Sequence, residues 1–253
     1  EDADGKLSYS KVWEAGERLS YTRWDARKIY TSFAGLTGIG NNLFMINSSF
    51  AIGSNPLLDS AAILGIADRN DRVGFISWLC GKNEYGEEGG AEIHKLWDIC
   101  NSGLVKVGAP SAPVFDPQYA AFRDTYKSRN KLIYVQSNAG MLHAFDDKTG
   151  NETFAFIPPN VLLNGRLSGL RSSDGSNAYS RSAASYSRYL LDGPVTVEDV
   201  VIGGQYRTLL LGQLGLGGAG MYVLDITSNT PEGARFKWAI ENDVHQYDVV
   251  NRD

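Results

Sequence analysis

The clearest match to a chemical motif is the glycine-rich string at residues 215–220, which satisfies the GxGxxG pattern of dinucleotide-binding loops. In such a loop the last glycine opens a helix, and the N-terminus of that helix binds the pyrophosphate. Here the residues that follow, Met221 to Leu224, have the apolar and β-branched character of a strand. We therefore predict that these glycines serve close backbone packing or a bulged turn and do not bind a nucleotide.

Other residue types that could do chemistry are scattered. Asp2 and Asp4 followed by Gly5 resemble the middle of a calcium-binding loop, but an EF-hand register then places Lys11 where a bidentate glutamate is needed. A surface turn is the simpler interpretation of that segment. No serine lies in a GxSxG pattern, and His143 falls inside a predicted strand, which favours a side chain of the sheet over a general base. The sequence therefore favours binding over catalysis.

The two cysteines, Cys80 and Cys100, have 19 residues between them and form no CxxC pair. With so few soft ligands, a structural zinc site is not indicated. A disulfide between them could form, and it would place the protein outside the cytosol.

The composition argues against several classes of protein. The chain has 253 residues, of which 43% are hydrophobic and 21% charged, so it can bury a sizeable core. Its 24 basic and 29 acidic residues give a net charge of −5, which argues against nucleic acid as a partner. No apolar run approaches the roughly 18 residues of a transmembrane segment. The chain starts at Glu1 without a signal peptide, as expected of a processed chain or an excerpt.

Residues 1–104 have a mixed, partly helical pattern and are predicted to lead into a second part at residues 105–253. Pro56 and the apolar run after it predict one helix. Asp71 is expected to cap a second helix that ends at Gly81.

From Val105 onward, runs of β-branched and aromatic residues alternate with turn residues, which predicts short strands. No amphipathic helix is expected among these strands. They are predicted near residues 112–116, 131–137, 141–146, 152–157, 194–201, 206–212, 220–226 and 234–240.

The pattern around Asp146 recurs around Asp225, 79 residues later, as a buried strand, an aspartate, a turn and an aromatic strand. This offset is nearly two repeats of about 40 to 50 residues, as in propeller arrays. Each aspartate is expected to cap the turn that begins the next strand. The predicted fold class is mainly β, with propeller blades of antiparallel four-stranded meanders in an incomplete propeller, after a short, partly helical N-terminal segment.

Residues 168–189 are dense in serine with interleaved arginine and tyrosine, and we predict a long exposed connection. One interpretation is an insertion loop without a role. The other is a contact surface, because tyrosine and arginine are enriched where proteins bind each other. The candidate contact residues are Arg171, Tyr179, Arg181, Tyr186 and Arg188.

Three sequence blocks, in this order, resemble the C-terminal β-propeller domain of the PilC/PilY type IV pilus proteins. They are GMLHAFDDKTGNETFAFIPPNVL, YLLDGP and RTLLLGQLGLGGAGMYVLDIT, and three upstream blocks, ARKIYT, ISWLCG and LWDICNS, resemble the region that leads into that propeller. The segment LHAFD alone is similar to any quinoprotein-like blade, but the full set in this order is specific.

The resemblance implies a non-enzymatic, secreted protein of the bacterial cell surface that acts at the tip of the type IV pilus. It implies roles in pilus assembly, in counteracting retraction and in adhesion to a host-cell or abiotic surface, with pilins or minor pilins as partners. The alternative is a quinoprotein-type propeller dehydrogenase, which would need a quinone, a calcium ion and a catalytic aspartate.

The chain departs from the family pattern in two ways. The family tends to have a basic residue where Cys80 stands and an aliphatic one where Cys100 stands, which suggests a disulfide that contributes about 3 kcal/mol. The family's alternating-aspartate calcium loop does not occur before Asp253. The resemblance therefore implies the N-terminal portion of the propeller, with no cofactor in this chain and calcium bound in the continuation beyond Asp253.

Overall fold

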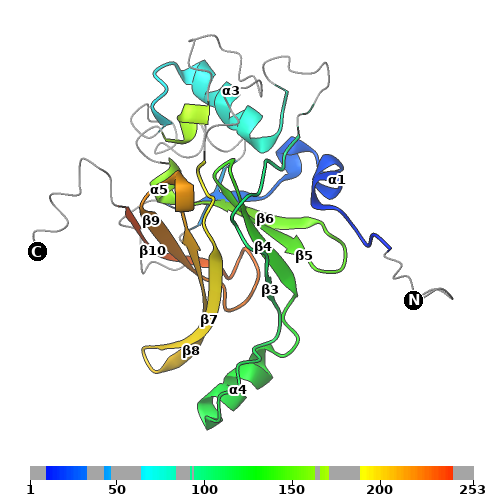
Figure 1. The fold of residues 1–253 in the computed structure, drawn as a ribbon, viewed down its shortest axis with the longest axis vertical. Coiled ribbons are helices and arrows are strands. Elements are labelled where there is room, and N and C mark those ends of the chain that lie inside the picture. The colour runs from blue at the N-terminus through cyan, green and yellow to red at the C-terminus, as the bar shows by residue number, and fades with distance from the viewer. Residues whose placement is uncertain are drawn as a thin grey trace, which may run out of the picture.

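The computed structural model describes residues 10–32, 43–46, 64–83, 92, 94–162, 166–170 and 189–241. The described part is mainly β, with two sheets that lie between helices at opposite ends of the molecule (Figure 1). This confirms the predicted fold class.

The first sheet contains an antiparallel meander of four consecutive strands. These are β3 (Val105–Val107), β4 (Leu132–Ser137), β5 (Met141–Asp146) and β6 (Glu152–Ile157). Two strands from the first hundred residues extend the sheet, because β1 (Ile29–Thr31) pairs in parallel with β6, and β2 (Phe44–Ile46) pairs with β1. Strands from both sides of residue 104 thus share one sheet.

The second sheet is a four-stranded antiparallel meander in the order β10-β9-β8-β7. Its strands are β7 (Val195–Ile202), β8 (Gln205–Gln213), β9 (Gly220–Asp225) and β10 (Arg235–Glu241). The strands predicted from residue 131 onward are therefore confirmed. A continuous hydrophobic core joins the two sheets, with Phe156 of β6 packed between Tyr222 and Phe236 of the second sheet.

Both predicted turn caps are confirmed. Asp146 Oδ1 accepts hydrogen bonds from the backbone N–H and the hydroxyl of Thr149, each at 2.8 Å. Asp225 Oδ1 accepts the same two bonds from Thr227, at 3.0 and 2.6 Å. The recurring aspartate therefore closes the turn after the third strand of each meander.

Among the described residues, four α-helices accompany the sheets: α1 (Ala15–Ser20), α3 (Arg69–Cys80), α4 (Pro117–Tyr126) and the short α5 (Pro159–Leu162). Helix α3 ends at Gly81, as predicted, with a φ of 113° that glycine adopts without strain. Its cap, however, is Asp68 and not Asp71, since the Asp68 carboxylate accepts from the Asp71 N–H at 3.0 Å. Most of the helix predicted after Pro56 lies outside the described residues.

Two predictions between β3 and β4 are wrong. Residues 112–116 form no strand, because Pro113 lacks a backbone donor and no strand of the described part pairs with them. Helix α4 then interrupts the strand series, where no helix was expected. Its start signal is present in the sequence, since the Asp116 side chain caps the helix and Pro117 occupies the first turn.

Candidate functional site

Hydrogen bonds of buried polar side chains connect the two sheets. Gln136 of β4 accepts a hydrogen bond from the Tyr222 hydroxyl at 2.7 Å and donates to the carbonyls of Gly193 and Gln213 at 2.7 and 2.8 Å. Gln136 and Tyr222 are fully buried. Because unpaired buried polar groups are costly, these bonds fix how the second sheet sits on the first.

A second hydrogen-bonded contact between the sheets is made by Asn229, in the turn between β9 and β10. Its Oδ1 accepts from the Tyr134 hydroxyl at 2.6 Å, and its Nδ2 donates to the carbonyls of Asn130 and Val107. Burial raises the pKa of Tyr134 far above its usual value, so its hydroxyl stays a donor. Asn229 has a φ of 55°, a left-handed conformation that asparagine tolerates better than most residues.

Beside this contact, a groove of about 330 Å³ runs between the edge of the first sheet and the edge of the second. One wall is β3 and the extended segment that follows it, and the other is β7 with Thr208 of β8. The lining residues are Val105 to Pro113, Arg129, Val197 to Asp199 and Thr208. A volume of this size is typical of small-ligand or peptide-side-chain sites, so the groove is the candidate functional site.

Arg129 is one of four charged residues that line the groove, with Lys106, Glu198 and Asp199. Its Nη1 donates to Thr208 Oγ1 at 2.7 Å and to the Thr227 carbonyl at 3.0 Å, and its Nε donates to the Gly108 carbonyl. Partial burial lowers the pKa of Arg129, and the nearby charge of Asp199 opposes that effect. The guanidinium is therefore held in one orientation by neutral acceptors.

Asp199 faces the same groove, but both of its oxygens already accept hydrogen bonds. Thr208 Oγ1 donates to Oδ1 at 2.6 Å, and the Tyr119 hydroxyl donates to Oδ2 at 2.7 Å. Tyr119 belongs to α4 and packs edge-on against Tyr206 of β8, with ring centroids 5.0 Å apart. Helix α4 is thereby attached to the end of the groove.

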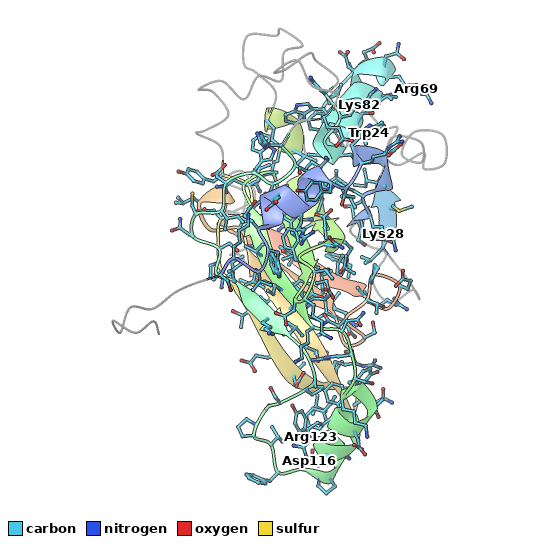
Figure 2. The ribbon with its side chains drawn as sticks, turned by 90° about the vertical axis from the view of Figure 1, so that its right-hand side faces the viewer. Trp24, Lys28, Arg69, Lys82, Asp116 and Arg123 are labelled. Atoms are coloured by element: carbon cyan, nitrogen blue, oxygen red, sulfur yellow. The ribbon has the colours of Figure 1, made fainter. Side chains whose placement is uncertain are left out.

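Helix α4 and the β7–β8 hairpin extend together at the end of the molecule opposite α3 (Figure 1). Figure 2 shows Asp116 and Arg123 at this end and Trp24 and Lys82 at the other. Apolar side chains are exposed here, including Phe115 with a relative exposure of 103% and Val201 with 55%. Contiguous exposed apolar patches mark interaction sites, whereas single exposed apolar side chains are normal on a protein surface.

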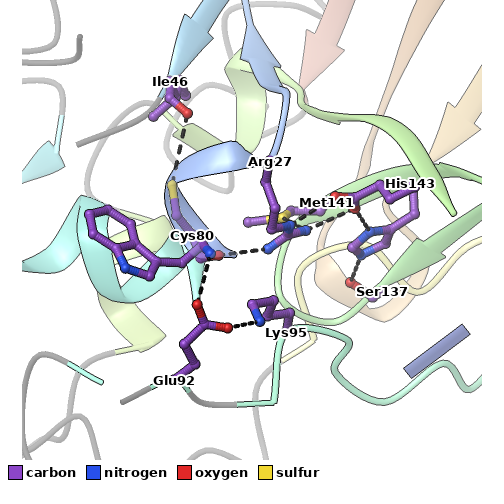
Figure 3. Close-up of polar contacts among 10 residues, drawn as sticks. Arg27, Ile46, Cys80, Glu92, Lys95, Ser137, Met141 and His143 are labelled. Atoms are coloured by element: carbon purple, nitrogen blue, oxygen red, sulfur yellow. Dashed lines mark hydrogen bonds and ion pairs between the residues drawn. The ribbon is translucent and has the colours of Figure 1, made fainter. Parts of the chain in front are cut away.

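A separate polar network lies inside the first sheet (Figure 3). His143 Nδ1 lies 2.8 Å from a Glu152 oxygen, and its Nε2 lies 3.0 Å from Ser137 Oγ. Because a carboxylate only accepts, Nδ1 carries the proton and Nε2 accepts from the serine hydroxyl. Arg27 donates to both oxygens of Glu152 at 2.8 Å and to the Cys80 carbonyl at 3.1 Å.

The hydrogen bonds link serine to histidine and histidine to a carboxylate, as in a hydrolase triad. Unlike the serine of an active site, however, this serine is not accessible to a substrate. Ser137 and His143 are fully buried and the Glu152 side chain is only 1% exposed, so a substrate cannot reach Ser137 without separating the strands. Burial alone would raise the pKa of Glu152, but the Arg27 charge and the hydrogen bonds outweigh it and lower the pKa to about 2. Burial lowers the pKa of His143. The network joins the N-terminal segment to the first sheet.

The two cysteines that were predicted to form a disulfide have different surroundings. Cys80 is buried at the end of α3, with Sγ 3.8 Å from the Ile46 carbonyl, whereas Cys100 is exposed, with Sγ 3.7 Å from Asp98 Oδ2. Both are free thiols here, so the predicted disulfide is not formed in the structure. The candidate contact residues Arg171, Tyr179, Arg181, Tyr186 and Arg188 lie outside the described residues.

The glycine-rich string packs backbone against backbone, as predicted. A Cβ on Gly217 would lie 2.2 Å from the Leu190 carbonyl oxygen, and one on Gly215 would lie 2.5 Å from the Gly193 nitrogen. The string then opens strand β9 at Gly220 and not a helix. Its glycines therefore allow close contact with the segment that precedes β7.

Within the described ranges, no helix is long and apolar enough to cross a membrane. In the same ranges, no three His, Cys, Asp or Glu side chains gather as a metal site would require. The sequence blocks LWDICNS and YLLDGP contact each other, since Asn101 donates from its backbone and its side chain to the buried carboxylate of Asp192.

Two consecutive four-stranded antiparallel meanders, packed face to face and each closed by a turn aspartate, define blades of a β-propeller. A family model described as the PilY1 β-propeller domain matches residues 96–253. The chain belongs to this family.

Its relatives agree with that assignment. The type IV pilus biogenesis factor PilY1 of Pseudomonas aeruginosa strain PAK is 35% identical over 257 residues, which cover 92% of this chain and 21% of that protein. A PilY1 homolog of Xylella fastidiosa is 35% identical over 153 residues, which cover 56% of this chain and 11% of that protein. This chain thus spans about a fifth or less of the relatives' length.

Among solved structures, the crystal structure of the Pseudomonas aeruginosa PilY1 C-terminal domain is similar in sequence. It has 33% sequence identity and a TM-score of 0.38, and the match covers 54% of this chain and 25% of that one.

Proposed function

We propose that this chain is the propeller portion of a type IV pilus biogenesis factor that acts without catalysis. The observation that carries the proposal is the 35% identity to PilY1 over 92% of the chain. The geometry is compatible with a binding role, since the buried Ser137, His143 and Glu152 hold the fold and the accessible groove joins two sheet edges.

In this proposal the protein acts at the pilus tip on the bacterial surface. It promotes pilus assembly with pilins or minor pilins, counteracts retraction and mediates adhesion to host cells or abiotic surfaces. Calcium would bind in the propeller sequence that continues beyond Asp253. These finer roles rest on the family resemblance.

The test is the number of surface pili, counted by electron microscopy, in a strain that lacks the gene, with and without the retraction motor. Pili lost in the single mutant and regained in the double mutant are the expected result. Normal piliation in the single mutant would overturn the assembly role. Purified protein that carries a quinone and oxidises alcohols would instead support a propeller dehydrogenase.

Adhesion is tested separately by replacing residues 168–189 with a short linker in the complementing gene. If that segment is the contact surface, pilus number stays normal and adhesion falls. Adhesion that persists at normal pilus number would show that the contact surface lies elsewhere.

A further inference from the structure

Strand β7 has one unpaired edge. It is the last strand of the second sheet, and among the described strands it pairs only with β8. The Pro194 carbonyl accepts from the Gln213 N–H, so the backbone of residue 194 points toward β8. Because this direction alternates along a strand, Val197, Asp199 and Val201 point their N–H and C=O groups away from β8. In the described part of the chain, these groups bond to no other strand.

This free edge borders the groove. Val197 and Asp199 line it, opposite the extended segment at residues 109–113. The two walls belong to different sheets, and β3 also ends its own sheet. An extended peptide in the groove could form backbone hydrogen bonds with the unpaired N–H and C=O groups along the β7 wall. Strands add to exposed sheet edges through hydrogen bonds of this kind.

Two exposed apolar side chains lie just beyond the lining residues of the groove, since Val201 is two residues after Asp199 and Phe115 two residues after Pro113. Val201 pairs with Tyr206, whose hydroxyl donates to Asp116 at 2.7 Å, and Asp116 directly follows the exposed Phe115. Val201 and Phe115 therefore both lie near Tyr206, beside the end of the groove where α4 packs. A strand that continued along β7 would bury apolar side chains against them, which stabilises the complex.

The inner part of the groove offers one unused cationic donor. Arg129 Nε and Nη1 are occupied, but Nη2 has no hydrogen-bond partner among the described residues. Both oxygens of Asp199 are occupied, and Lys106, which also lines the groove, pairs with Asp147. Glu198 is a lining residue too, but its side chain points to the other face of β7 from Asp199 because side chains alternate along a strand. The complementary group on a ligand is therefore a carboxylate, which guanidinium binds with charge-assisted hydrogen bonds.

We propose that this groove binds an extended segment of a partner protein, which adds as a strand to the free edge of β7. The segment places an acidic side chain at Arg129 and apolar side chains beside Val201 and Phe115. The proposal does not depend on the pilus role, because it concerns the purified chain, and its failure would leave the pilus counts unaffected.

The test uses a peptide labelled with fluorescein at its N-terminus, fluorescein-Gly-Glu-Thr-Val-Thr-Val-Thr-Gly-amide, and fluorescence anisotropy with the purified chain. Its glutamate and its two valines lie on one face of an extended strand, as the proposal requires. Val201→Pro removes an outward N–H but none of the bonds to β8, and proline is tolerated on edge strands. We expect this variant to bind at least about tenfold more weakly, through loss of strand pairing. Val201→Ala keeps the N–H and is the matched control, with a smaller loss.

Two further measurements identify the mode of binding. Hydrogen exchange, followed by mass spectrometry, should slow in residues 195–202 when the peptide is added. Replacing the peptide's glutamate by glutamine should weaken binding about five- to tenfold, because the charge-assisted bond to Arg129 is lost. Circular dichroism confirms that Val201→Pro is folded.

The proposal is overturned if the peptide does not bind at about 1 mM, an affinity too weak for recognition. It is equally overturned if Val201→Pro binds as tightly as the unmodified chain, or if exchange in residues 195–202 is unchanged at saturation. A glutamine peptide that binds equally well would remove the role of Arg129.

Discussion

Arg27 and Glu152 form a bidentate ion pair, with both N···O distances at 2.8 Å and neither side chain more than 1% exposed. Arg27 precedes β1, and Glu152 begins β6, so the pair fastens the N-terminal segment to the first blade. A buried pair of this kind stabilises only as long as both partners are present.

Replacing Arg27 by methionine should therefore destabilise the protein by about 3–5 kcal/mol, because the Glu152 charge stays buried without its partner. The measurement is urea unfolding at pH 7, followed by circular dichroism. Arg23→Met is the matched control, since Arg23 pairs with Asp25 on the surface. Its loss should cost at most about 1 kcal/mol. Equal costs for the two variants would contradict the buried-pair interpretation.

The same network predicts a loss of stability in acid. The pKa of Glu152 is lowered to about 2 and that of His143 is lowered from its usual value, so the unfolded chain binds more protons than the folded one as the pH falls. Stability should decrease below about pH 6.5, where the unfolded histidine takes up a proton, and further below about pH 4.5, where unfolded glutamate does.

His143→Gln isolates the histidine contribution. Between about pH 6.5 and 5 the variant's stability should depend less on pH, by up to about 1.4 kcal/mol per pH unit, since one proton is involved. The exposed His94 provides the control variant, His94→Gln, which removes a histidine outside the buried network. A His143→Gln curve parallel to that of the unmodified chain would show that the folded protein accepts a proton on His143.

Much of the blade architecture could be predicted from the sequence, because it depends on local patterns. Asp146 and Asp225 mark turns that their own side chains close, and the apolar runs around them become strands. The prediction of a strand at residues 112–116 was wrong. Apolar residues alone do not make a strand there, because Pro113 has no backbone N–H to donate to a neighbouring strand and no described strand pairs with this segment.

The candidate site could not be predicted from the sequence, because it depends on distant contacts. Arg27 lies 125 residues from Glu152, and Gln136 lies 86 residues from Tyr222. The groove exists only because β3 and β7, which are far apart in the chain, both end their sheets. No local pattern around Arg129 or Asp199 indicates that they share it.

Gly212 of β8 is the cross-strand partner of Tyr222 of β9, and the Tyr222 ring packs against it. A Cβ at this position would lie 2.3 Å from the Tyr222 Cζ atom. Gly212→Ala should therefore displace the ring and its hydrogen bond to Gln136, at a cost of about 1–3 kcal/mol. Gly103→Ala is the matched control, because a Cβ on Gly103 would meet no atom within 4 Å among the described residues. Urea unfolding of both variants tests this, and equal stability would mean that the ring is free to shift.

The two cysteines should differ in reactivity. Burial raises the pKa of Cys80 to about 12, and desolvation and the nearby Asp98 carboxylate also raise the pKa of Cys100, which lowers the reactive thiolate fraction of both. The difference is access, because Cys100 is exposed and Cys80 is buried. In the unreduced native chain, iodoacetamide should label Cys100 in the folded state and Cys80 only after unfolding, as read by mass spectrometry. Cys100→Ser should abolish only the labelling of the folded chain. If neither thiol reacts until a reductant is added, the pair forms the disulfide that the sequence predicts.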